Sequence, residues 1–161
     1  MPGKGRKVHG QIILYCGVAA LVCLLDQVSK FYSEKFIDLG KSVPLIKDTI
    51  HLTLVHNTGA AFGIFKGHPH MFSAVAVLSA VLIVYFFTKK NQIFLVEEKT
   101  ALALILGGAI GNLIDRIRLG YVVDFIDLRV WPVFNIADSF ITIGAVVLGV
   151  SIIFRSKGKE V

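Results

Sequence analysis

Residues 8–25 read VHGQIILYCGVAALVCLL, 18 consecutive positions without a charged side chain. A helix of this length nearly spans the hydrocarbon core of a bilayer. Three further uncharged runs follow, and the last two are short, so we expect polar flanking residues to enter the membrane. The sequence predicts one membrane-embedded domain over residues 1–161, with four transmembrane helices at about 8–25, 67–88, 100–114 and 136–154.

The composition agrees with an apolar solvent. Of 161 residues, 55% are apolar, and 17 basic plus 11 acidic side chains make up only 17% of the chain, against about 25% in ordinary globular proteins. This excludes a disordered chain, a soluble enzyme and a coiled coil. The net charge of +6 does not indicate a nucleic-acid partner, because the basic residues interrupt apolar runs instead of gathering on one exposed face.

The first run, which follows three basic residues, also has the form of a secretory signal peptide. Against that alternative, it lacks a small-x-small cleavage site and continues directly into the charged sequence DQVSK. It is also followed by three more apolar runs. We therefore interpret it as the first transmembrane helix.

The distribution of Lys and Arg predicts the orientation. Residues 1–7, 89–99 and 155–161 carry nine basic side chains in 25 positions, whereas the other two connections carry eight in 65. Both termini are therefore expected in the cytoplasm, with extracytoplasmic loops at about 37–66 and 116–134.

Acidic residues then meet at one membrane boundary. In this orientation the first helix ends outside at Asp26, the third ends outside at Asp115, and the fourth begins outside near Asp138. Because an ionised carboxylate in hydrocarbon costs several kcal/mol, acids brought to one level indicate a polar site at the extracytoplasmic boundary.

The first outer loop predicts a small β-sheet. In TIHLTLV (49–55), Ile50, Leu52 and Leu54 alternate with polar residues, which is the pattern of a half-buried strand. Asn57 and Gly59 then favour a turn. We expect a cradle lying on the membrane, with this loop closing over a substrate as a lid.

Two of the acids fit catalytic chemistry. Asp124 lies among apolar neighbours, and Asp138 opens an apolar helix, where the alternative role is an N-cap. Two carboxylates held together in a low-dielectric site share a proton, so that one activates a water while the other polarises a carbonyl, as in aspartic peptide hydrolysis. Spacing alone does not show that they meet.

Asp115 and Asp127, the other two acids between residues 107 and 138, have simpler interpretations. Asp115 is adjacent to Arg116 and close to Arg118, which favours a paired acid at a helix end. Asp127 precedes Arg129 by two positions and is interpreted as a solvated loop charge.

Five ordered motifs resemble those of the bacterial lipoprotein signal peptidases, the type II signal peptidases: DQVSK (26–30), NTGAAFG (57–63), GNLIDR (111–116), VVDF (122–125) and FNIAD (134–138). The resemblance covers nearly the whole chain. It implies an aspartic endopeptidase of the bacterial cytoplasmic (inner) membrane, acting without metal or cofactor. Such an enzyme cuts diacylglyceryl prolipoproteins just before the lipidated cysteine. We expect a monomer in contact with membrane lipid.

The resemblance also assigns roles by motif position. It implies that Asp124 and Asp138 are the catalytic pair. The residues implied to organise the substrate pocket are Asn57, Gly59, Asn112, Arg116 and Asn135. Those implied to support the scaffold are Asp26, Lys30 and Asp115, and the first two have the i, i+4 spacing of a helical ion pair.

Two other functional classes remain open from the residues alone. Intramembrane acids also suit a small multi-pass transporter or proton relay, although these acids gather at one boundary and no inverted repeat is visible. A metallohydrolase would need clustered ligands, and none of the five histidines forms an HExxH motif.

Overall fold

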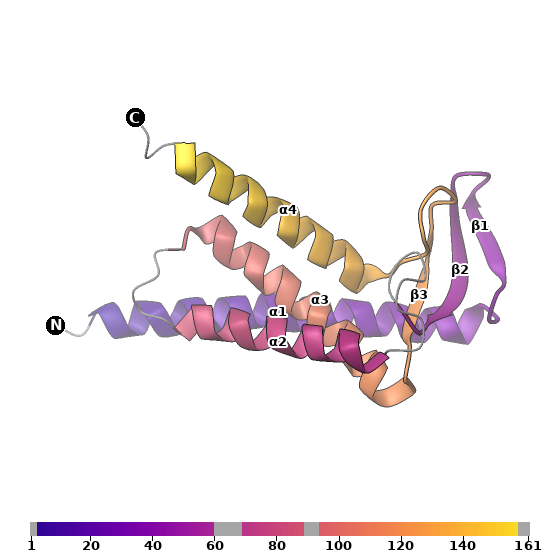
Figure 1. Ribbon diagram of the computed structural model, residues 1–161, viewed down its shortest axis with the longest axis horizontal. Helices are drawn as coiled ribbons and strands as arrows, with labels where there is room; N and C mark the ends of the chain where they lie inside the picture. The colour runs from indigo at the N-terminus through magenta and orange to yellow at the C-terminus, as the bar shows by residue number, and fades with distance from the viewer. Residues whose placement is uncertain (1–2, 60–68, 89–93, 158–161) are drawn as a thin grey trace.

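The computed structural model describes residues 3–59, 69–88 and 94–157. Over these residues the chain forms four helices that extend along the long axis and a small sheet at one end (Figure 1). The helices are α1 (Gly3–Phe36), α2 (Pro69–Thr88), α3 (Val96–Leu119) and α4 (Ile136–Lys157). The strands are β1 (Ser42–Ile46), β2 (Ile50–Asn57) and β3 (Val122–Asp127).

Several sequence-based expectations lie outside the described residues. Residues 60–68 include the end of the NTGAAFG motif, part of the expected lid and the start of the expected second span. Lys89, Lys90 and Lys159, which contributed to the predicted orientation, also lie outside.

Three stretches of the described residues are long and apolar enough to cross a membrane: Gly10–Phe36, Val96–Leu119 and Ile136–Arg155. In α2 the apolar stretch is Val77–Phe86. Large apolar side chains point outward along these helices, as at Ile13 (72% exposed) and Phe154 (69% exposed). Such a surface is suited to lipid, because the side chains are apolar and the helical backbone satisfies its own hydrogen-bonding groups without water.

Two helices extend beyond the uncharged runs that predicted them. The first continues to Phe36, well past the expected boundary at residue 25, so that Asp26 and Lys30 lie within α1. The third begins at Val96 and ends at Leu119, which brings Asp115 and Arg116 into α3. The uncharged runs marked only the apolar cores of these helices, because charged residues such as Asp26, Lys30 and Asp115 are buried and paired inside the protein without ending the helix.

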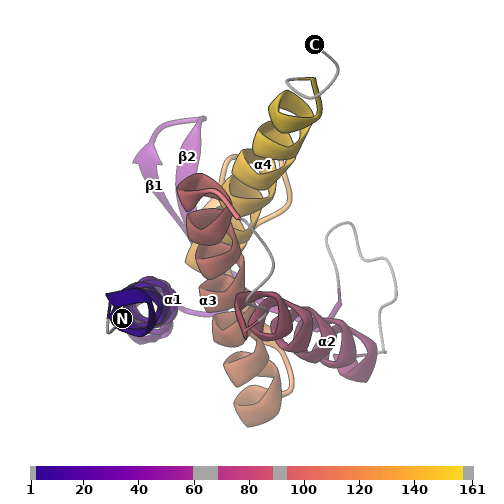
Figure 2. The same ribbon diagram turned by 90° about the vertical axis from the view of Figure 1, so that its left-hand side faces the viewer.

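Helix α3 lies at the centre of the bundle and packs against α1, α2 and α4 (Figure 2). Small residues allow the close approach of α4. A Cβ atom added at Gly108 would lie 2.6 Å from the carbonyl oxygen of Ala137. Small residues at helix interfaces permit such backbone contact in membranes, so the start of α4 is held directly against α3.

The sheet is antiparallel with the order β1-β2-β3. The predicted strand at 49–55 is confirmed as β2, and its apolar face packs as the alternation indicated: Leu54 is buried against Ile37 and Val123, with Leu52 beside them. Strands β1 and β3 were not predicted. In β3 the sequence VVDFID is buried on both faces, so it shows no alternation.

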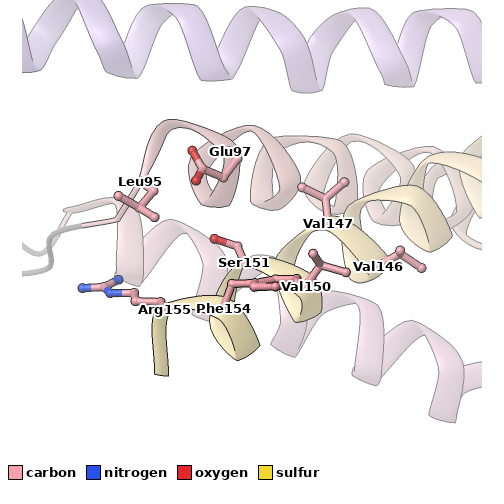
Figure 3. Close-up of a pocket in the computed structure, with 8 residues that line it drawn as sticks. All are labelled: Leu95, Glu97, Val146, Val147, Val150, Ser151, Phe154 and Arg155. Carbon is pink, nitrogen blue, oxygen red and sulfur yellow. The ribbon is translucent and has the colours of Figure 1, made fainter. Parts of the chain in front are cut away.

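A groove of about 460 Å³ lies between α3 and α4 at the end away from the sheet (Figure 3). Its walls are mainly apolar and include Val147 and Phe154, with Arg155 at the polar edge. Arg155 lies 3.3 Å from the buried carboxylate of Glu98, which also accepts the backbone N–H of Leu95 in a capping interaction. This pair joins the start of α3 to the end of α4.

Candidate active site

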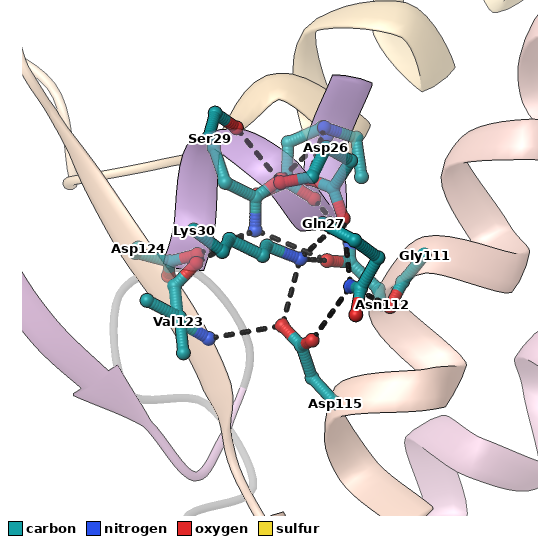
Figure 4. Close-up of polar contacts among 12 residues, drawn as sticks. Asp26, Gln27, Ser29, Lys30, Gly111, Asn112, Asp115, Val123 and Asp124 are labelled. Atoms are coloured by element: carbon teal, nitrogen blue, oxygen red, sulfur yellow. Dashed lines mark hydrogen bonds and ion pairs between the residues drawn. The ribbon is translucent and has the colours of Figure 1, made fainter. Parts of the chain in front are cut away.

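A buried ion cluster lies where α1 crosses α3 (Figure 4). The Nζ atom of Lys30 lies 2.7 Å from Oδ2 of Asp26 and 2.7 Å from Oδ2 of Asp115, and it donates to Oδ1 of Asn112 at 2.9 Å. The i, i+4 pair expected in α1 is therefore present. Asp115 lies near the end of α3, as expected, but the cation that pairs with its carboxylate at 2.7 Å is Lys30 of α1, which the neighbouring arginines did not indicate.

Two asparagines connect this cluster to the two candidate catalytic carboxylates. Asn112 of α3 donates from Nδ2 to Oδ1 of Asp138 at 2.7 Å. Asn135, which precedes α4, donates from Nδ2 to Oδ1 of Asp124 at 2.7 Å and to Oδ1 of Asn112 at 3.0 Å. The carboxylates on β3 and α4 are thus held on the two sides of one hydrogen-bonded pair of amides.

The end of β2 supplies a second donor to Asp124. Asn57 donates from Nδ2 to Oδ2 of Asp124 at 2.7 Å. Its own Oδ1 accepts the backbone N–H of Gly59 at 3.0 Å, so the turn expected at these residues is present. Both oxygens of Asp124 are therefore fixed, one from the sheet and one from the loop before α4.

Asp138 is not the N-cap of α4, which was its alternative role. The N-cap is Asn135, whose Oδ1 accepts the N–H of Asp138 at 2.9 Å. The N–H of Ala137 is accepted by Oδ1 of Asp26 at 2.9 Å. Asp138 occupies the third position of the helix, and its carboxylate contacts Asn112 instead of capping a backbone amide.

Arg116 brings a positive charge to the same region. Its guanidinium donates to the carbonyl oxygen of Asn112 at 3.3 Å. It also interacts electrostatically with Asp138, Asp124 and Asp115. A half-buried guanidinium at this place can stabilise negative charge that develops beside the carboxylates.

The environment of Asp124 favours its protonated form. Its side chain is 1% exposed, and burial, followed by the negative charge of Asp138, raises its pKa from 3.8 to about 7. The hydrogen bonds from Asn57 and Asn135 oppose this rise without cancelling it. Near neutral pH this carboxyl therefore exchanges its proton readily, as a general acid–base group requires.

Asp127 is not the solvated loop charge that the sequence indicated. It ends β3, is only 6% exposed, and accepts the hydroxyl of Thr53 at 2.7 Å and the N–H of Arg129 at 2.8 Å. Burial alone would raise its pKa, but these hydrogen bonds and the Arg129 charge lower the pKa below its ordinary value. Asp127 therefore binds Thr53 and Arg129 at the polar face of the sheet, and none of these contacts belongs to the cluster around Lys30.

Sequence reasoning did not single out Gln27. Its Nε2 donates to Oδ1 of Asp115 at 2.8 Å and to the carbonyl oxygen of Gly111 at 3.2 Å. The available signal was an uncharged amide directly after Asp26 in an apolar helix, where it needs a partner. Among residues 3–59, 69–88 and 94–157, no group of three His, Cys, Asp or Glu side chains is arranged to hold a metal ion.

The apolar helices thus bring a buried carboxylate, Asp124 on β3, and a half-buried one, Asp138 on α4, to one end of the bundle, which suits aspartic peptide hydrolysis at a membrane boundary. The family model for signal peptidase (SPase) II matches residues 18–154. The chain therefore belongs to the signal peptidase II family, whose members are aspartic-type peptidases. This membership replaces the alternatives of a transporter, a proton relay and a metallohydrolase, and with the apolar helices it fits a bacterial inner-membrane protein.

Individual relatives agree over most of their length. A lipoprotein signal peptidase of Halothermothrix orenii is 48% identical over 133 residues, covering 81% of this chain and 89% of that protein. One from Caldanaerobacter subterraneus is 46% identical, covering 86% and 94%. A solved bacterial membrane enzyme superposes with a TM-score of 0.85 at 34% identity, covering 92% of each chain.

Proposed function

We propose that this protein removes signal peptides from diacylglyceryl prolipoproteins by cutting just before the lipidated cysteine, with Asp124 and Asp138 as the catalytic pair. The observation that carries this proposal is that two carboxylates from separate elements are held by one pair of hydrogen-bonded asparagines. Family membership supports the substrate class, and the relatives are named lipoprotein signal peptidases.

The reaction follows from one proton shared by the pair. Asp124, with its pKa near 7, carries the proton, and Asp138 is the base. A water molecule attacks the peptide carbonyl carbon while Asp138 takes its proton and Asp124 protonates the carbonyl oxygen. When the C–N bond breaks, Asp138 protonates the leaving amine and the new hydroxyl returns its proton to Asp124. Both carboxyls then have their starting protonation, and no covalent intermediate is formed.

The polar residues around the pair position the substrate. Asn112 and Asn135 fix the carboxylate rotamers, so the pair needs little reorganisation during the reaction. Arg116 can donate to a carbonyl of the extended peptide. Asn57 and Gly59 form the turn beside Asp124, where the peptide ahead of the lipidated cysteine passes.

The membrane arrangement completes the proposal. The chain is a single domain and a monomer with four spans, both termini are cytoplasmic, and the pair lies near the extracytoplasmic face. In support, the beginning of α1 and the end of α4 lie at the same end of the molecule, away from the sheet (Figure 1). The sheet and the turn at Asn57 and Gly59 form the cradle that covers the substrate. Membrane lipid surrounds the apolar helices, the acyl chains of the substrate lie between them, and no nucleic acid is bound.

Substitution by asparagine tests the pair, because asparagine keeps the shape of aspartate without its charge or titratable proton. We expect Asp124→Asn and Asp138→Asn each to lower the cleavage rate of a lipidated prolipoprotein by roughly a hundredfold to ten-thousandfold. Asp38→Asn, at an exposed position after α1, is the matched control. Asp127→Asn is less suitable because that carboxylate is buried and bonded to Thr53. Near wild-type cleavage by either folded variant of the pair would show that the assignment is wrong.

A further inference from the structure

Gln27 joins the two carboxylates that flank Lys30. Its Nε2 atom lies 2.8 Å from Oδ1 of Asp115 and 3.3 Å from Oδ2 of Asp26. Because the amide has two N–H groups, one donates to Asp115 and the other is shared between Asp26 and the carbonyl oxygen of Gly111, which lies 3.2 Å away and ties α1 to α3 at the same level. One neutral amide thus contacts both acids and the backbone of the neighbouring helix.

Each of these two carboxylates holds the backbone directly before one member of the catalytic pair. Oδ1 of Asp26 accepts the N–H of Ala137, the residue before Asp138. Oδ2 of Asp115 accepts the N–H of Val123, the residue before Asp124, at 3.2 Å. The separation of Asp26 from Asp115 therefore controls the separation of the two backbone segments that carry the catalytic carboxylates.

Charge makes the amide important to this arrangement. Lys30 already directs its ammonium to Asp26, Asp115 and Asn112, which accounts for its three N–H donors. Two buried carboxylates around one ammonium leave an excess negative charge, and they repel each other. Gln27 adds N–H donors without adding charge, and it binds the Asp115 oxygen opposite the one that Lys30 and Val123 use. It thereby fixes the rotation of the Asp115 carboxylate.

We propose that Gln27 is a positioning residue for peptide hydrolysis: by tying Asp115 to Asp26, it sets the geometry of Asp124 and Asp138 through the two amides that precede them. This inference rests on the proposed catalytic pair. Gln27 acts through other residues and touches neither carboxylate of the pair in the contacts described above.

The test uses Gln27→Met, which keeps the length of the side chain and removes its donors, in the full-length protein purified in detergent. We expect kcat for a lipidated prolipoprotein to fall by roughly tenfold to a hundredfold, because small misplacements of reacting groups carry penalties of this size. KM is expected to stay within about twofold, since the substrate pocket is unchanged. Gln11→Met is the matched control: it lies on the same helix, is exposed, and contacts Lys99 away from the site.

The kcat value is taken per folded enzyme, measured from the monodisperse fraction and its thermal transition. A merely structural role would lower the yield or Tm of Gln27→Met and leave its kcat at the wild-type value, which would overturn the inference. If Gln27→Met does not fold, Gln27→Asn replaces it. Gln27→Asn keeps the amide but shortens the side chain by one methylene, so the amide no longer reaches Asp115. The same fall in kcat is expected, and a wild-type kcat would again overturn the inference.

The catalytic pair is tested in the same assay. If Asp124→Asn is inactive and Gln27→Met has wild-type kcat, only the role of Gln27 is rejected. If Asp124→Asn retains wild-type kcat, the catalytic pair is rejected, and the role of Gln27 is rejected with it.

Discussion

Raising the pH from 6 to 8 is expected to lower kcat/KM about tenfold, because kcat/KM follows the titration of the free enzyme. In the proposed mechanism Asp124 must carry a proton to polarise the substrate carbonyl, and its pKa is about 7. At pH 6 about 90% of Asp124 is protonated and at pH 8 about 10%, from the titration of one group, so the active fraction falls nearly tenfold over this interval. The sign follows from the role of the group: loss of a required acid reduces the rate on the alkaline side.

The assay is kcat/KM for a lipidated prolipoprotein in detergent, measured at substrate concentrations well below KM from pH 5.5 to 9. Stability must be followed in parallel. The folded pKa of Asp124 lies above its unfolded value of 3.8, so the folded state binds the extra proton and the free energy of unfolding falls as pH rises from about 4 to about 7. The thermal transition at each pH separates unfolding from loss of the catalytic proton.

A variant of Asn57 sharpens the prediction. The hydrogen bond from Asn57 lowers the pKa of Asp124, so Asn57→Ala should raise this pKa and move the alkaline limb to higher pH, even though kcat itself falls. A kcat/KM that stays constant between pH 6 and 8 in folded enzyme would refute the role of Asp124 as the acid. A limb displaced to lower pH in Asn57→Ala would contradict the electrostatic account of its pKa.

Two further substitutions test the supports of the site. A Cβ atom at Gly111 would lie 2.5 Å from Oδ2 of Asp26, so Gly111→Ala should destabilise the fold by about 1–3 kcal/mol and reduce kcat. Gly149 has open space around it, so Gly149→Ala should change neither quantity. Equal Tm and kcat in the two variants would contradict this packing. Glu98→Gln removes a buried charge far from the site and should lower the free energy of unfolding by about 1–2 kcal/mol, with kcat per folded enzyme unchanged. Glu97→Gln, at an exposed position, is its control in thermal or denaturant unfolding. A lower kcat in Glu98→Gln would show that the two ends of α4 are coupled.

The apolar helices and one strand could be predicted from the sequence because their signals are local. The run at 8–25 identified the core of α1, and alternation in TIHLTLV identified β2. The strand VVDFID could not be predicted in the same way, since burial on both faces removes the period of two. The candidate pair was inferred from apolar surroundings and from motif resemblance, while the meeting of Asp124 and Asp138 depends on tertiary packing.

The errors concerned partners far apart in the chain. Asp115 has arginines close by in sequence, yet it pairs with Lys30, which another helix delivers. Asp127 was expected to be a solvated loop charge, yet it pairs with Arg129, and β2 covers the carboxylate and adds the hydroxyl of Thr53. Charges adjacent in sequence are weak evidence for ion pairing when a buried partner on another element competes.

The hydrogen bond between Asp26 and the N–H of Ala137 joins positions 111 residues apart and links the first helix to the last. During synthesis, α1 is complete long before the ribosome reaches α4. The carboxylate of Asp26 therefore lacks this backbone donor until α4 has been synthesised and packed, and the same event brings in Asp138. A nascent chain lacking its last helix contains Asp124 and every support on α1 and α3, but it has no partner carboxyl. If Asp124 and Asp138 are the catalytic pair, proteolytic competence is thus acquired in one step, when α4 packs against α1 and α3.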